Sequence, residues 1–257
     1  RPVRSNEDLT AAIQAAGGAP LTVVYRRSGA RHTATLTPTA DENGHYKAGV
    51  WVRDSGAGIG TMSFVDPQRG TFAGLGHSIS DADTGADLTL LSGEIVPVTI
   101  TGCIRGAAGS PGELRGEFAA APAGTVLAND AAGVYGSYTG SCTAPALPVA
   151  NLQEVTPGEA ELWTTVLGTT AQPYTIQVER VTMTGSDPNR NLLIRVTDKR
   201  LLDATGGVVQ GMSGSPIVQN GRLAAVLTHV LVNDPSRGYA IFATTMLEKA
   251  DAVASSK

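Results

Sequence analysis

The chain has 257 residues, of which 42% are hydrophobic and only 16% charged, so intrinsic disorder is excluded as its main state. A net charge of -4 and a pI near 5.6 have the wrong sign for a protein that grips phosphate backbones, which argues against nucleic acid as a partner. The 31 glycines and 14 prolines interrupt the backbone often and favour a mostly β fold. No apolar run reaches the roughly 18 residues that cross a bilayer, so a soluble chain is expected.

The first forty residues predict a small unit made of one helix and two strands. Residues 5–16 are expected to be helical, because Ser5 and Asp8 resemble a capping box and apolar residues follow at helical spacing. Strands are expected at residues 21–26 and 32–38. This unit is too small to bury a core alone. Residues 41–44 are expected to form a linker after it.

From residue 46 onward the pattern changes to short strands separated by turn residues. Tyr174, Ile176 and Val178 alternate with polar residues, which is typical of a strand with one buried face. Many short strands at this spacing predict a barrel or a sandwich. The other predicted strands cover residues 59–65, 95–101, 162–167, 192–197, 215–219 and 223–232.

The C-terminal residues predict a helix. Thr245 and Glu248 can form a capping box, and Met246, Ala250 and Val253 share one helical face. We expect this helix to pack across the barrel.

A serine between two glycines is the most informative local pattern. Ser213 follows Gly211 and Met212 and precedes Gly214. A nucleophilic serine needs its hydroxyl on a tight turn beside backbone N–H groups that can bind the carbonyl oxygen under attack, and glycine suits such turns. The alternative is a surface hairpin turn, since Gly-x-Ser-Gly is a common string.

Such a serine needs a base, and histidine has a suitable pKa. Of the four histidines, His32 and His45 lie in or beside the first small unit. His77 lies at a strand-to-loop junction and His229 lies within a predicted strand, so spacing alone leaves both as candidates for the base.

The sequence predicts no metal ion and no cofactor. Two cysteines and four scattered histidines do not make a structural zinc site, and whether Cys103 and Cys142 form a disulfide or stay reduced is left open. The glycines at 56, 58 and 60 are followed by a predicted strand rather than by a helix, so they do not form a dinucleotide-binding loop.

Five strings, in order along the chain, resemble the peptidase domain of the stage IV sporulation protein B family. This resemblance implies a serine endopeptidase with a chymotrypsin-like double β-barrel, a preceding PDZ domain and a role in signalling during endospore formation. The strings are residues 57–61 (AGIGT), 76–81 (GHSISD), 196–202 (VTDKRLL), 206–216 (GGVVQGMSGSP) and 228–235 (THVLVNDP).

The resemblance also implies roles for individual residues. Ser213 corresponds to the nucleophile, His77 to the general base and Asp198 to the acid that orients the imidazole, in the chain order of chymotrypsin-like enzymes. By the same analogy the N–H groups of Gly211 and Ser213 form the oxyanion hole. His229 would line the substrate pocket.

Asp198 departs from the general chymotrypsin-like pattern. It lies only fifteen positions before Ser213 (213 minus 198), whereas such enzymes usually place the acid much further upstream, although the sporulation family shares the shorter spacing. Asp130 and Asp81 are the reserve candidates.

By resemblance, residues 1–40 are the C-terminal half of a PDZ domain and residues 46–257 are the peptidase domain. The implied partners are a protein substrate, a membrane-bound regulatory protease complex, or the chain itself through self-cleavage. The implied location is outside the cytoplasm, between the two membranes of a developing spore, with any membrane anchor upstream of this sequence. The alternatives are a catalytically silent peptidase-fold module that holds a partner, and a serine esterase, which would need a Gly-x-Ser-x-Gly elbow.

Overall fold

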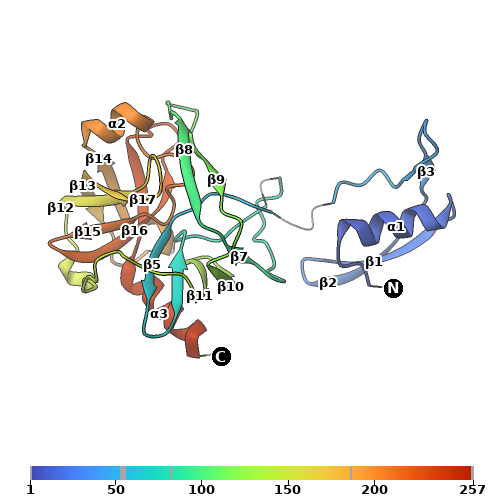
Figure 1. Cartoon of the computed structure of the whole chain (residues 1–257), viewed down its shortest axis with the longest axis horizontal. Coiled ribbons are helices and arrows are strands. Elements are labelled where there is room, and N and C mark those ends of the chain that lie inside the picture. The colour runs from blue at the N-terminus through green and yellow to red at the C-terminus, as the bar shows by residue number, and fades with distance from the viewer. Residues whose placement is uncertain (1, 53–55, 82, 186, 256–257) are drawn as a thin grey trace. The chain divides into compact units, whose positions relative to one another are not determined.

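The computed structural model describes residues 2–52, 56–81, 83–185 and 187–255. The chain divides into two compact units, Arg1–Gly58 and Ile59–Lys257, each of which is described by itself (Figure 1). No helix in the described part of the chain is long and apolar enough to span a membrane.

The first unit begins with a helix and an antiparallel hairpin. The predicted helix is confirmed as α1 (Asn6–Ala16), with the hydroxyl of Ser5 accepting a hydrogen bond from the Asp8 N–H at 3.2 Å. The predicted strands are confirmed as β1 (Leu21–Arg27) and β2 (Ala30–Leu36), which pair along their whole length.

Residues 41–44 form a turn rather than the expected linker. They connect β3 (Thr39–Ala40) to β4 (Tyr46–Lys47), and the Asp41 carboxylate accepts from the N–H groups of Asn43 and His45. The prediction of a linker was wrong because an aspartate that binds the backbone two and four residues ahead stabilises a tight turn.

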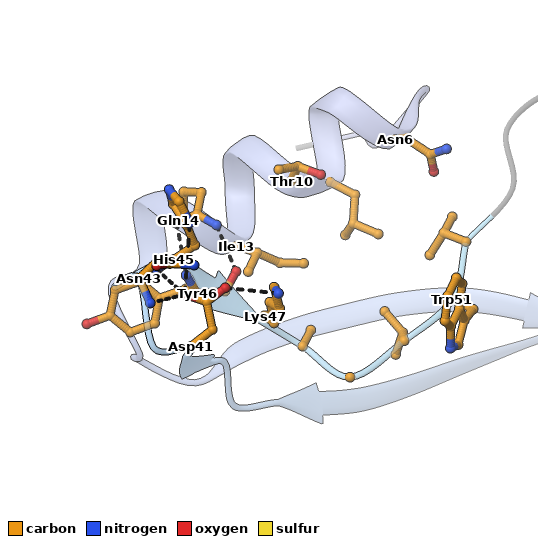
Figure 2. A pocket seen from close by; sticks show the side chains of 15 residues that line it. Asn6, Thr10, Ile13, Gln14, Asp41, Asn43, His45, Tyr46, Lys47 and Trp51 are labelled. Atoms are coloured by element: carbon orange, nitrogen blue, oxygen red, sulfur yellow. Dashed lines mark hydrogen bonds and ion pairs between the residues drawn. The ribbon is translucent and has the colours of Figure 1, made fainter.

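A groove of about 1000 Å³ lies between α1 and residues 45–52 (Figure 2). The Gln14 side chain holds one end of it, donating to the Tyr46 carbonyl at 2.7 Å and accepting from the Tyr46 N–H at 3.1 Å. Trp51, at the other end of the labelled lining, is fully exposed.

The second unit contains a closed barrel of six antiparallel strands. Their order around the barrel is β12-β13-β14-β17-β16-β15. Tyr174, Ile176 and Val178 are buried in its core, as their alternation predicted. The strands are β12 (Gly158–Thr164), β13 (Gln172–Val181), β14 (Leu192–Val196), β15 (Pro216–Gln219), β16 (Arg222–Val230) and β17 (Arg237–Phe242).

A five-stranded sheet with the order β5-β6-β11-β10-β7 forms the other half of this unit. The mostly β fold is confirmed, with one half closed as a barrel and this half open. The strands are β5 (Met62–Asp66), β6 (Thr71–Gly74), β7 (Glu94–Ile95), β10 (Gly124–Asp130) and β11 (Gly133–Tyr138).

The hairpin of β8 (Val98–Ile104) and β9 (Glu113–Phe118) does not extend the open sheet. These strands pair with each other, and Ile100 and Leu114 pack into the barrel core instead. Cys103, on β8, and Cys142 are both free thiols.

The terminal helix α3 (Ala243–Ser255) packs against both halves, as expected. Its buried Met246 and Ala250 share a cluster with Tyr135 of the sheet and Ile241 of the barrel. The helix starts three residues earlier than a capping box with Thr245 as N-cap predicts. The proposed capping box of residues 245 and 248 therefore lies inside it.

Three short helical segments were not predicted. They are η1 (Leu152–Glu154), η2 (Pro188–Arg190) and α2 (Lys199–Thr205).

Candidate active site

Ser213 lies on a tight turn just before β15. Gly214, directly after it, has φ +97, and a Cβ there would stand 1.9 Å from the Thr61 carbonyl oxygen, so only glycine fits. The Thr61 N–H donates to the Ser213 carbonyl at 2.8 Å. The turn is thus held against the residues that enter β5.

The Ser213 hydroxyl donates to the carbonyl of Thr228, on β16, at 2.7 Å. Within the described residues, the N–H groups of Gly211 and Ser213 donate no hydrogen bond. Both donors are therefore available to a carbonyl oxygen placed beside the hydroxyl, which is the requirement for an oxyanion hole.

His77 reaches the barrel from the end of β6. Leu75 and Gly76 turn the chain with φ +67 and +69, and a Cβ on Gly76 would come within 3.0 Å of the Thr228 side chain. The imidazole of His77 then lies against that of His229, with ring centroids 4.7 Å apart and an angle of 34° between planes. His77 therefore faces the part of β16 that holds the Ser213 hydroxyl.

One hydrogen bond fixes the tautomer of His77. Its Nδ1 lies 2.7 Å from the carbonyl oxygen of Ser78. Because a carbonyl can only accept, Nδ1 carries the proton and Nε2 keeps its lone pair. Burial lowers the pKa of His77 below its usual 6.5, and the Ser78 carbonyl partly offsets this, so the ring is neutral near pH 7.

His229 is neutral as well. Although the residue is exposed overall, partial desolvation of the ring, followed by the nearby His77 and Arg190, lowers its pKa to about 4, while Asp187 acts in the opposite direction. Two neutral rings can lie in contact without charge repulsion.

Asp198 has different partners from those implied by the resemblance. Its carboxylate caps α2 by accepting from the Arg200 N–H at 2.8 Å, and it also accepts from the Thr175 N–H and the Arg200 guanidinium. Its side chain is 9% exposed, and the hydrogen bond from Arg200 chiefly lowers its pKa to about 2. Asp198 makes no hydrogen bond to His77 or His229 in the part of the chain described, so its orienting role stays a prediction.

The reserve acids also have local partners. Asp130 accepts from the Ala132 N–H and pairs with Lys249 at 3.3 Å. Asp81 accepts from the N–H and the hydroxyl of Thr84. Among the described residues, no cluster of three or more metal-ligating side chains is present.

Sequence reasoning missed Asn129, which lies on β10 beside the loop that follows His77. Its side-chain oxygen accepts from the Ile79 N–H at 2.7 Å, and its Nδ2 donates to the carbonyls of Ile79 and Leu88 at 3.0 Å each. No local motif signals this contact, because the partners are 50 and 41 residues apart.

The sequence model described as SpoIVB peptidase S55 matches residues 44–247. The chain belongs to this family. It is accordingly a serine peptidase by family, as the sequence resemblance indicated. No curated protein matches the chain.

Solved structures similar to this S55 peptidase are distant from it. The active form of the protease Rv3671c from M. tuberculosis has 17% identity and a TM-score of 0.36, covering 62% of this chain and 79% of that one. Its inactive form gives 16% and 0.36, covering 56% and 72%. The HtrA-type protease AlgW with a decapeptide gives 13% and 0.38, covering 76% and 62%. The family assignment rests on the sequence match.

Proposed function

We propose that this S55 peptidase is a serine endopeptidase with Ser213 as nucleophile and His77 as general base. The observation that carries the proposal is the set of contacts made by His77 and Ser213 where the sheet meets the barrel. There the ring of His77 lies against the tilted ring of His229, next to Thr228, whose carbonyl binds the Ser213 hydroxyl. The protonated Nδ1 of His77 leaves Nε2 as the atom that can accept the serine proton.

The reaction follows from these positions. The Ser213 hydroxyl leaves the Thr228 carbonyl, gives its proton to Nε2 of His77, and its oxygen bonds to the peptide carbonyl carbon. The N–H groups of Gly211 and Ser213 bind the resulting oxyanion, and the loss of one such donor typically costs about 3 kcal/mol in the transition state. The imidazolium then protonates the leaving amine, and water hydrolyses the acyl-enzyme by the same base.

Asp198 was expected to orient His77. Since its carboxylate is engaged by Arg200 and Thr175, the proposed function rests on the pair Ser213 and His77. His229 is assigned to the wall of the substrate cleft, because it is exposed and its ring contacts the ring of the base.

The finer assignments come from the sporulation family. We propose a regulatory role in sporulation signalling, with a protein substrate, a membrane-bound protease complex or the chain itself as target, in the space between the two membranes of a developing spore. We also propose that residues 1–40 are the C-terminal half of a PDZ domain, which the order helix, strand, strand in this segment supports.

The Ser213→Ala variant tests the function. It should lose peptide cleavage and labelling by a fluorophosphonate probe, while its melting temperature stays near that of the wild type, since one hydrogen bond contributes about 1 kcal/mol. Ser92→Ala, which changes an exposed serine of the same unit, is the matched control and should keep both activities. Cleavage that persists in Ser213→Ala would end the proposal.

A second candidate is a catalytically silent module that binds a partner through the peptidase fold. It is favoured by one observation, which is that the Ser213 hydroxyl donates to Thr228 and not to His77. A folded wild-type protein that neither cleaves peptides nor reacts with the probe would support it.

A further inference from the structure

The group that holds the general base in place is a main-chain carbonyl. We propose that the Ser78 carbonyl orients His77, and that Asn129 is the positioning residue that fixes this carbonyl. The inference rests on the proposed function and names a residue to which no role has been assigned.

The carbonyl lies at the base of a hairpin. After His77 two short segments pair in antiparallel fashion. The Leu88 N–H donates to the Ile79 carbonyl at 2.9 Å, and the Asp81 N–H donates to the Ala86 carbonyl at 2.8 Å. Ser78 stands at the base of this hairpin, so its carbonyl direction depends on how the base is held.

Asn129 holds the base of the hairpin from the neighbouring strand β10. Its amide oxygen binds the Ile79 N–H, and its two amide hydrogens serve the carbonyls of Ile79 and Leu88. The oxygen and both hydrogens are therefore used on the two chains of the hairpin, which leaves the amide one orientation. The Ile79 N–H belongs to the same peptide group as the Ser78 carbonyl, so the bond from Asn129 fixes the plane of that group.

Asp87, on the returning chain of the hairpin, holds the side chain of Ser78. Its carboxylate accepts from the hydroxyls of Ser78 and Ser80. The carbonyl that binds Nδ1 of His77 is thus held through both the backbone and the side chain of its residue.

A carbonyl in this place has chemical consequences. It fixes the tautomer of the imidazole as a carboxylate would, but it stabilises the imidazolium less, because it carries only a partial charge. The carbonyl raises the pKa of His77 by less than burial lowers it, so the pKa of the base lies below the usual histidine value. A base of this kind stays deprotonated in mildly acidic solution.

Kinetics of the full chain test the proposal. Asn129→Ala should lower kcat about 10²-fold, because small misplacements of a catalytic group have effects of that order. KM should change little, and the acidic limb of the pH–kcat profile should move to lower pH, because the ring loses the carbonyl that favours its charged form. Thr125→Ala, an exposed change on the same strand, is the control and should match the wild type.

The variant Asp198→Asn distinguishes orientation of His77 by the Asp198 carboxylate from orientation by the Ser78 carbonyl. If the carboxylate orients His77, the loss should approach 10⁴-fold, as for a triad aspartate. The carbonyl proposal expects less than about tenfold, because an asparagine still caps α2. A wild-type profile for Asn129→Ala, or a loss near 10⁴-fold for Asp198→Asn, would overturn the inference while the Ser213→Ala result leaves the function intact.

A titration by NMR covers the case in which Asn129→Ala does not fold. The His77 resonance, assigned with His77→Gln, should titrate at the same pH in wild type and in Asp198→Asn. A fall of one to three pKa units in Asp198→Asn would show a carboxylate partner and contradict the proposal. Cleavage retained by Ser213→Ala would instead remove the function on which the inference depends.

Discussion

The two halves of the peptidase unit differ in how they are stabilised. The barrel closes on itself around one large cluster of buried residues that includes Leu162, Ile194 and Leu227. The sheet stays open, and its own cluster is small, formed by Phe72, Val126 and Val134 with partly buried neighbours. The proposed nucleophile Ser213 therefore lies on the half with the larger buried core, and the proposed base His77 lies on the half with less buried apolar surface. We expect their separation to be more sensitive to changes in the sheet than to changes in the barrel.

The largest expected effect comes from breaking the barrel half at the serine turn. Gly214→Ala should destabilise the protein by more than about 4 kcal/mol, because the residue has positive φ and its Cβ would overlap the Thr61 carbonyl. Gly221→Ala, with φ +72 and open space around the Cβ, should cost only about 1 kcal/mol. Urea unfolding measures both, and equal losses would show that the close approach to Thr61 is unimportant.

Core truncations sharpen the comparison of the halves. Ile194→Ala in the barrel should lower the free energy of unfolding by about 3 kcal/mol and leave the kcat of the folded fraction near the wild-type value. Val134→Ala in the sheet should cost less stability but lower kcat, because β11 pairs with β6, which leads to His77. Unfolding curves and kcat on the same samples decide this, and a lower kcat in the barrel variant alone would reverse the assignment.

The third expected effect is a loss of stability in acid at the contact between His77 and His229, where the two halves meet. The pKa values of His77 and His229 are lower in the folded chain than the usual 6.5, so the unfolded chain binds more protons below that pH. The melting temperature should therefore fall as pH decreases from 6.5 towards 4. His229→Gln should flatten this dependence, and an unchanged slope would show that the ring contact does not control it.

The smallest effect is expected at the exposed helix α2. Asp198→Ala should cost about 1 kcal/mol through the lost N-cap, whereas Asp203→Ala, which removes only an exposed pair with Lys199, should cost less than about 0.5 kcal/mol. Thermal melts of both variants give these values. Similar melting temperatures would show that the cap is unimportant.

Sequence patterns predicted the features that depend on neighbouring residues. The alternation from Tyr174 to Val178 identified a barrel strand, and the glycines around Ser213 identified a strained turn. Asp198 is the N-cap of the helix α2, which had not been predicted, and its role as the orienting acid stays a prediction. Aspartate suits both roles, so the residue type could not decide between them.

Other features depend on contacts between distant segments. The clamp of Asn129 on residue 79 joins side chain to backbone across 50 positions, and no spacing rule reports such a contact. The open sheet also depends on distant contacts. Part of β8 was predicted as a strand and β9 was not, and the packing of Ile100 and Leu114 into the barrel core could not be predicted from either pattern.

The hydrogen bond from Ser213 to the Thr228 carbonyl holds the hydroxyl of the proposed nucleophile when no substrate is bound. A hydroxyl held in this way is about 1 kcal/mol less available to any electrophile that drifts past, which is roughly a fivefold reduction in chance acylation. A bound polypeptide that pairs with this stretch of β16 would compete for the Thr228 carbonyl and release the Ser213 hydroxyl. We therefore expect substrate binding itself to make the hydroxyl available for reaction.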